Sequence, residues 1–430
     1  MRGVPVLTVS VCAILAHTPV CAEPSFSSDA VKHVWVQVAP PNVGIVRALT
    51  EASACPHVRF DSRVVRMKER AASDKDFNIR TCEATVPPDT RRINVAGKSL
   101  RPPPVRPVRI AVVGDTGCRL KVGRSLDDGF QACNDPEDWE FAKVAKQVAA
   151  WKPDLVIQVG DYIYREQACP DGNKGCEGSP FNSPGMRWET WEADYFTPAA
   201  PMLEAAPMLF VRGDHETCER AGDGFFRFLD PFRFRGCTDF SDPYALTFKG
   251  LQLVVMDTAQ ADDTTLSPQV VIERYRQDFE RVKRLATGNA WLLSHIPIWG
   301  IRPIVADGSQ VEALNITVQD ALSGLLPPAI DLILTGHVHL GEVLSFTGNR
   351  PPQMVVGTGG TLLLPKVTKN IVRMKIDGEV VTLATIVSTH GFFTFEPWPP
   401  HAWKTTILNE IGSRLAICRL ADKSAICRTD

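Results

Sequence analysis

Between residues 108 and 340, short apolar runs alternate with longer segments in which apolar residues recur at helical spacing. The apolar runs predict buried strands and read VRIAVV, DLVIQV, PMLFV, LQLVV, AWLL and DLILT. The segments between them predict helices over 136–151, 188–206, 268–285 and 318–326. Apolar strands that alternate with helices indicate a sheet covered on both faces, so the pattern predicts an α/β fold.

The pattern differs on either side of this region. Residues 23–100 carry short β-like runs separated by Pro, Asn and Ser-Asp turn signals, which predict a small β-sandwich-like domain. The stretch RPPPVRP at 101–107 excludes regular structure and predicts a stiff linker. We expect one large domain over 108–395 and a peripheral C-terminal tail over 396–430.

The first 22 residues have the pattern of a secretory signal peptide. Arg2 supplies a positive charge, 4–16 is mostly apolar, and 20–22 offers small residues before a cleavage site at Glu23. The alternative, a membrane anchor, needs about 20 apolar residues. This stretch is shorter and is interrupted by Pro5 and Pro19. We therefore expect export to a periplasmic or extracellular location and no membrane span.

Cysteine spacing supports an exported protein. Cleavage removes Cys12 and Cys21 from the 12 cysteines and leaves an even number, grouped as close neighbours along the chain. Nearest-neighbour pairing predicts the disulfides Cys55–Cys82, Cys118–Cys133, Cys169–Cys176, Cys218–Cys237 and Cys418–Cys427. A zinc site is the alternative, but no pair has the C-x₂-C spacing. The net charge of −2 gives no indication of a nucleic-acid partner.

Metal-binding residue types follow five of the predicted strands. They are Asp115, Asp161 with Tyr164, Asp214 with His215, His295, and His337 with His339. In open α/β sheets, ligands bind beyond the carboxyl ends of the strands, so these side chains should converge. Each piece alone is common, but the complete ordered set is not. Carboxylate, imidazole and phenolate together suit Fe, Mn or Zn.

The ordered set resembles the calcineurin-like metallophosphoesterase superfamily, and within it the purple acid phosphatases. That pattern is D-x-G, G-D-x-x-Y, G-N-H-E/D, a histidine and G-H-x-H. The chain reads DTG from Asp115, GDYIY ending at Tyr164, GDHE ending at Glu216, His295, and GHVH ending at His339. The resemblance implies a metallophosphoesterase-type α/β sandwich of two sheets flanked by helices, with a small N-terminal all-β domain.

The resemblance also implies the roles of these residues. One metal would be held by Asp115, Asp161, Tyr164 and His339, and the second by Asp161, Asp214, His295 and His337. Tyr164 implies Fe(III), with Zn, Mn or Fe as the divalent partner. His215 would assist substrate binding or leaving-group protonation, with Glu216 as a weaker supporting candidate. Two such metals would lower the pKa of a bound water, which then attacks phosphorus as hydroxide.

The implied activity is that of an exported phosphomonoesterase. The alternatives are a phosphodiesterase acting on nucleotides or phospholipid headgroups, and a non-catalytic module that binds metal or phosphate. The intact ligand set argues against the module. Candidate substrate contacts are Arg187, Trp188, Arg212, Trp299 and Arg302. Asn315-Ile316-Thr317 fits a glycosylation sequon. The glycine-rich stretch at 355–361 lacks the Lys-Ser/Thr of a phosphate-binding loop.

Asp214 stands where the family pattern has asparagine, so the second metal site carries one more negative charge. We predict that this charge weakens the attraction for phosphate or changes the metal preference. Inhibition by inorganic phosphate should therefore be stronger in Asp214→Asn than in the natural chain. Equal inhibition constants in the two proteins would refute the prediction.

Overall fold

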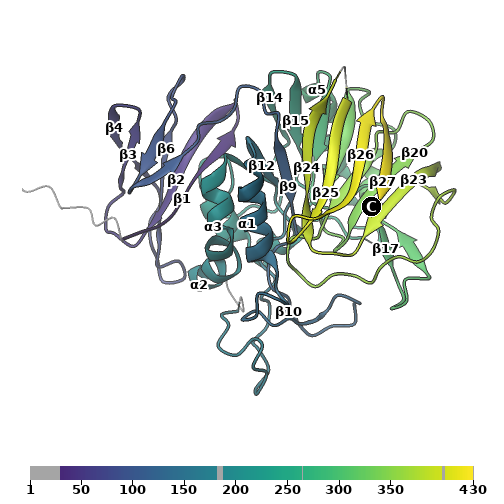
Figure 1. Ribbon diagram of the computed structural model, residues 1–430, viewed down its shortest axis with the longest axis horizontal. Helices are drawn as coiled ribbons and strands as arrows, with labels where there is room; N and C mark the ends of the chain where they lie inside the picture. Colours follow the sequence, from purple (N-terminus) through teal and green to yellow (C-terminus); the bar gives the residue numbers. More distant parts are fainter. Residues whose placement is uncertain (1–29, 182–186, 264, 400–401, 430) are drawn as a thin grey trace, which may run out of the picture.

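The computed structural model describes residues 30–181, 187–263, 265–399 and 402–429, so the expected signal peptide lies outside the described residues. Two large sheets dominate the fold (Figure 1). The first has 11 strands, in the order β27 (Ser424–Thr429), β26 (Arg414–Ala421), β25 (Ala402–Asn409), β24 (Gly391–Trp398), β9 (Ile110–Val113), β12 (Leu155–Gln158), β13 (Met208–Phe210), β1 (Val31–Ala39), β2 (Val43–Thr50), β6 (Arg80–Thr85) and β5 (Lys68–Ala71).

The second sheet has eight strands, in the order β14 (Tyr244–Phe248), β15 (Leu251–Val255), β16 (Ala290–Leu293), β19 (Ile330–Thr335), β21 (Gln353–Val356), β20 (Gly341–Phe346), β23 (Glu379–Val387) and β22 (Lys375–Ile376). Smaller sheets pair β10 (Leu120–Lys121) with β11 (Gly129–Phe130), pair β17 (Ile301–Pro303) with β18 (Val311–Ala313), and join β4 (Arg63–Arg66), β3 (His57–Phe60), β7 (Ile93–Val95) and β8 (Lys98–Leu100).

An apolar layer joins the two large sheets. Val112, Ile157 and Leu209 of the first sheet belong to the same buried cluster as Leu293 and Leu334 of the second. The other face of each sheet is covered by helices, as the sequence predicts. The first sheet packs against α1 (Phe141–Trp151) and α3 (Thr197–Ala205), and the second against α5 (Gln269–Leu285) and α6 (Ile316–Leu322). The α/β sandwich is therefore confirmed.

The predicted helices are present with shifted ends. Residues 136–140 form turns, so α1 begins at Phe141. The predicted helix over 188–206 consists of α2 (Trp188–Trp191), a π-helical turn (Glu192–Phe196) and α3. The side chain of Asn315 caps α6 by accepting from Val318 N, which starts this helix earlier than the apolar spacing predicts. A further short helix, α4 (Gly222–Phe228), was not predicted.

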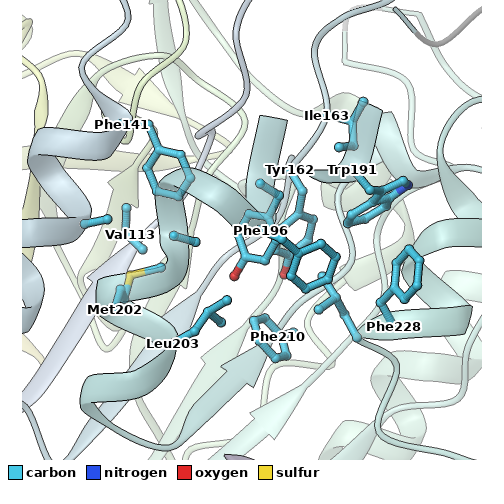
Figure 2. Close-up of a cluster of buried hydrophobic side chains, with 14 of the residues drawn as sticks. Val113, Phe141, Tyr162, Ile163, Trp191, Phe196, Met202, Leu203, Phe210 and Phe228 are labelled. Atoms are coloured by element: carbon cyan, nitrogen blue, oxygen red, sulfur yellow. The ribbon is translucent and has the colours of Figure 1, made fainter. Parts of the chain in front are cut away.

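An aromatic cluster under α2 and α3 supports the loops at the carboxyl ends of β12 and β13 (Figure 2). Tyr162 is fully buried there, 5.0 Å from the ring of Tyr195, and its hydroxyl donates to Val211 O at 2.8 Å. Burying one such side chain stabilises the fold by roughly 1.5–3 kcal/mol. This packing gives the GDYIY segment a rigid base.

The N-terminal region is all-β, as expected, but its longest strands continue the first sheet. β1 pairs in parallel with β13, with Gln37 opposite Met208. The buried guanidinium of Arg47 reinforces this junction by donating to the carbonyl oxygens of Phe228 and Asp230. The N-terminal region therefore shares a sheet with the rest of the molecule. The domain boundaries inferred from the sequence remain a prediction.

The C-terminal segment is part of the first sheet. β24, β25, β26 and β27 form one antiparallel edge of the first sheet and add buried side chains such as Ile407 and Leu420 to the layer between the sheets (Figure 1). All five predicted disulfides are present. Within the described residues, no helix combines the length and the apolar composition needed to cross a bilayer.

Candidate metal centre

The sandwich brings the ends of β9, β12 and β13 next to those of β16 and β19, since all of these strands run parallel within their sheets. Two groups of ligand atoms form there, each within 4.8 Å of one another. One group is Asp115, Asp161 and His339, and the other is Asp161, Asp214, His295 and His337. Asp161 belongs to both, which is the arrangement of a bridging carboxylate.

Tyr164 joins the first group. Its hydroxyl oxygen lies 2.9 Å from Asp115 Oδ1, 2.6 Å from Asp161 Oδ2 and 2.8 Å from His339 Nε2. Tyr162, two residues earlier, belongs to the aromatic core instead. The structure thus places all seven predicted metal ligands together and separates the two tyrosines by role.

Sharp turns deliver these ligands from the strands. Asp115, Asp161 and His337 have φ of 57°, 51° and 72°, in the left-handed region. Such a conformation costs roughly 1–3 kcal/mol for a residue other than glycine and is typical of functional sites. The preceding glycines permit close approach. A Cβ on Gly336 would lie 2.5 Å from Asp115 Oδ2, and one on Gly160 would lie 2.3 Å from His295 Nδ1.

Each ligand histidine directs one ring nitrogen to the centre and the other to a supporting oxygen. His295 Nε2 lies 3.1 Å from Asp214 Oδ1, while its Nδ1 lies 2.7 Å from Val159 O. His337 Nδ1 lies 2.9 Å from Asp214 Oδ1. Its Nε2 lies 2.7 Å from Asp263 Oδ2. His339 Nδ1 lies 2.7 Å from Asp127 Oδ2, with the oxygen out of line with the ring N–H.

The electrostatics of the centre fit a pair of cations. Burial, together with the Asp161 carboxylate, raises the pKa of Asp115 to about 6, although His295 opposes the shift. Burial also raises the pKa of Tyr164 well above its usual value, and Asp115 and Asp161 add to the effect. A buried phenolate among carboxylates needs a highly charged cation to form. The donors present therefore suit a dinuclear metal site.

Asp214 has a partner that the sequence pattern does not reveal. Arg220 Nη1 lies 2.8 Å from Asp214 Oδ2, and its other terminal nitrogen pairs with Glu166. Burial raises the pKa of Asp214, but the charge of His337 and the hydrogen bonds of His295 and His337 lower it by more. The pKa therefore lies well below its usual value. The extra carboxylate of the second site is therefore ionised and partly offset by an arginine.

His215 lies beside the metal ligands and lines the cavity in front of them. Its backbone N donates to Asp161 Oδ1 at 3.0 Å. Its Nδ1 lies 2.9 Å from Glu166 Oε1, and its Nε2 lies 3.4 Å from Arg119 Nη1. Burial and the charge of Arg220 lower the pKa of His215, so the neutral ring is favoured. This position suits contact with a substrate bound at the metals.

Glu216 supports the backbone of the site and does not line the cavity. Its fully buried carboxylate accepts from Asp161 N at 3.1 Å, Tyr162 N at 3.0 Å and Gly213 N at 3.1 Å. Burial raises its pKa to about 8, although the N–H of Tyr162 opposes the shift. The carboxyl group ties the second motif to the third, so we assign Glu216 a positioning role and not contact with the reacting atoms.

A cavity of about 210 Å³ lies in front of the centre. Several of its lining residues were not predicted from the sequence, namely Arg119, Lys121, Asp127, Asp128, Arg220 and Asp263. Two features of the sequence could have indicated some of them. Arg119, Lys121, Asp127 and Asp128 lie inside the Cys118–Cys133 loop that follows the first motif, and Arg220 lies soon after the third motif. Among the described residues, the larger cavities of about 480, 560 and 460 Å³ are lined by other residues.

Of the five predicted substrate contacts, Arg302 lines the cavity. Trp188 and Trp299 are buried in the apolar clusters, and Arg212 is buried against Asp257. Arg187 is exposed and does not line the cavity. The glycine-rich stretch packs behind the first motif, where Thr361 N donates to Asp115 O at 3.1 Å.

Comparison with known proteins agrees with this geometry. Residues 108–341 match the sequence profile of the calcineurin-like phosphoesterases. A search of curated protein sequences found no match. The fold is similar to that of purple acid phosphatase PPD1 from yellow lupin (Lupinus luteus) seeds, with a TM-score of 0.58 and 12% identity, over 93% of this chain and 74% of that one. It is also similar to PhoD, with a TM-score of 0.54 and 11% identity, over 92% and 91% of the two chains.

The turn at Gly160 generates a prediction with a matched control. Gly160→Ala and Gly172→Ala both place alanine at a positive φ, at 103° and 80°, which costs about 1–2 kcal/mol in each case. The added Cβ clashes with His295 at Gly160 and meets nothing within 4 Å at Gly172. We expect Gly160→Ala to lose metal from the second site and Gly172→Ala to keep it, as measured by metal content per chain. Equal metal content in the two variants would contradict this assignment.

Proposed function

Because the chain belongs to the calcineurin-like phosphoesterase family, we propose that it is an exported dinuclear-metal hydrolase of phosphomonoesters. The observation that carries the proposal is the shared position of Asp161 between two ligand groups, with Tyr164 completing the first. Asp115, Asp161, Tyr164 and His339 would hold Fe(III). Asp161, Asp214, His295 and His337 would hold a divalent Zn, Mn or Fe ion.

The chemistry divides between the metals and the chain. When bound, two such ions lower the pKa of a coordinated water and stabilise the charge that develops on the phosphoryl oxygens. His215 lines the cavity, so it is placed to bind the phosphoryl group, and it can protonate the leaving oxygen only in the fraction of the protein in which its ring is charged. The carbonyl oxygen of Ile163, 3.1 Å from His215 Nδ1, and the carboxylate of Glu166, 2.9 Å from the same atom, orient the ring. Arg119, against His215 Nε2, adds a positive charge beside the same position.

The shape of the cavity favours a small phosphate ester. Among the described residues, its lining has no Phe, Tyr or Trp on which a nucleobase could stack, and its apolar members are Leu314, Val338 and Leu364. Its arginines are largely matched by carboxylates, for example Arg119 by Asp128 and Arg220 by Glu166. The attraction for phosphate therefore comes mainly from the two metal positions, which suits a single phosphoryl group.

Export is supported by the disulfides together with the predicted signal peptide. Five disulfides join the pairs predicted from sequence spacing. Disulfide bonds persist in oxidising compartments such as the periplasm and the extracellular space. We place the mature protein, from Glu23, in one of these.

The proposal predicts faster turnover of monoesters than of diesters. With two metals bound, kcat/KM for p-nitrophenyl phosphate should exceed that for bis(p-nitrophenyl) phosphate at least about tenfold. The monoester dianion offers the metals three non-bridging oxygens and two negative charges, whereas the diester offers two oxygens and one charge. His295→Ala removes a ligand and should lower kcat/KM by more than the ~100-fold that losing a supporting partner costs. His57→Ala, at an exposed position in β3, is the control and should change nothing.

The opposite substrate preference would favour the phosphodiesterase. No turnover of either ester by protein that contains two metals would favour the non-catalytic module, because the ligand set would then serve binding alone.

A further inference from the structure

The sequon Asn315-Ile316-Thr317 has a structural role that its sequence does not suggest. Asn315 is fully buried, and its side-chain Oδ1 accepts from Val318 N at 2.9 Å. Its Nδ2 donates to Asp263 Oδ1, also at 2.9 Å. Both ends of the amide are therefore engaged inside the fold, which excludes glycan attachment to the folded chain.

Thr317 holds the same neighbouring segment. Its buried Oγ1 accepts from Ser267 N at 3.0 Å and lies 3.1 Å from Ser267 Oγ. Ser267 Oγ in turn accepts from Asp262 N at 3.0 Å. Asn315 thus holds the carboxylate of Asp263 directly. Thr317 holds Ser267, which in turn holds Asp262, so the segment around Asp263 is fixed in place.

Asp263 faces the second metal position through one histidine. Its Oδ2 lies 2.7 Å from His337 Nε2, on the side of the ring away from the ligand cluster. His337 Nδ1 points into the cluster, 2.9 Å from Asp214 Oδ1. When Nε2–H donates to Asp263, the lone pair of Nδ1 is left free for a metal. Arg302 Nη1, 3.5 Å from the same Asp263 oxygen, provides a weaker second partner.

We propose that Asp263, held by Asn315, is a positioning residue that sets the affinity of the second metal site through His337. The inference rests on the proposed function, because it takes the His337 position to be a metal site. The first site has a different support, since its histidine, His339, lies beside Asp127. Loss of Asp263 should therefore weaken one metal selectively.

Substitution of Asp263 by asparagine tests the role of the carboxylate at nearly constant size. The two carboxylate oxygens accept from Asn315 Nδ2 and from His337 Nε2 at once. An amide has a single acceptor oxygen. In Asp263→Asn, one orientation of the new amide loses the contact with Asn315. The other orientation turns its NH₂ group toward His337 Nε2, which must then accept, so the ring proton moves to Nδ1 and blocks the metal.

The experiment is a titration of Zn²⁺ into iron-loaded protein, with both metals counted per chain by elemental analysis. For Asp263→Asn we expect zinc to bind about 10–100-fold more weakly, with iron content unchanged. At saturating zinc, kcat should recover, because all seven metal ligands are intact. Glu312→Gln is the matched control: it removes the other carboxylate that pairs with Arg302, at 2.6 Å, and should leave zinc affinity unchanged.

Zinc affinity within twofold of the natural chain, or equal loss of iron and zinc, would overturn the inference. If Asp263→Asn does not fold, the titration is repeated with Asp263→Ser, which leaves room for a bridging water. The same zinc affinity and iron content then decide whether the inference holds. If the natural chain binds no second metal, the proposed function itself is contradicted. If it binds two metals and Asp263→Asn changes neither, only the inference about Asp263 fails.

Discussion

The apolar layer between the two sheets determines where the functional residues can lie. Side chains such as Ile157 and Leu334 hold the sheets face to face, so that strands from both end at one rim. Asp161 then follows β12 in one sheet and His337 follows β19 in the other, and the two meet in one ligand cluster. Without this layer, ligands far apart in the sequence would have no common position.

Concentrating carboxylates at that rim has an electrostatic cost, and several devices offset it. Metal ions would supply most of the positive charge. Around them, Arg220 pairs with Asp214, and Asp263 supports His337 from the outer side. Glu216 ties the Asp161 and Gly213 turns together through their backbone N–H groups. The site therefore depends on an outer layer of polar contacts as much as on the ligands themselves.

The sequence predicted the ligands because they are tied to strand ends, where a short apolar run and a polar residue recur together. The alternation of strands and helices and the five disulfides were predictable for the same reason, since both follow from local spacing. The two-sheet sandwich was expected from the resemblance to the metallophosphoesterases. Asp263 and Asp127 were not found, since each lies in an irregular segment and acts through a histidine distant in sequence. Arg220 was also not found, although it lies only six residues after its partner Asp214. The pairing of β1 with β13 and the sheet position of the C-terminal strands are likewise non-local, so neither was predicted from the sequence.

Elemental analysis of the purified, export-matured protein tests the central claim most directly. The account predicts about two metals per chain, with iron near one, because the two ligand groups share Asp161 and only one contains Tyr164. Two zinc or two manganese ions without iron would keep the hydrolase and contradict the role given to Tyr164. Substoichiometric metal that reconstitution cannot restore would contradict the dinuclear centre altogether.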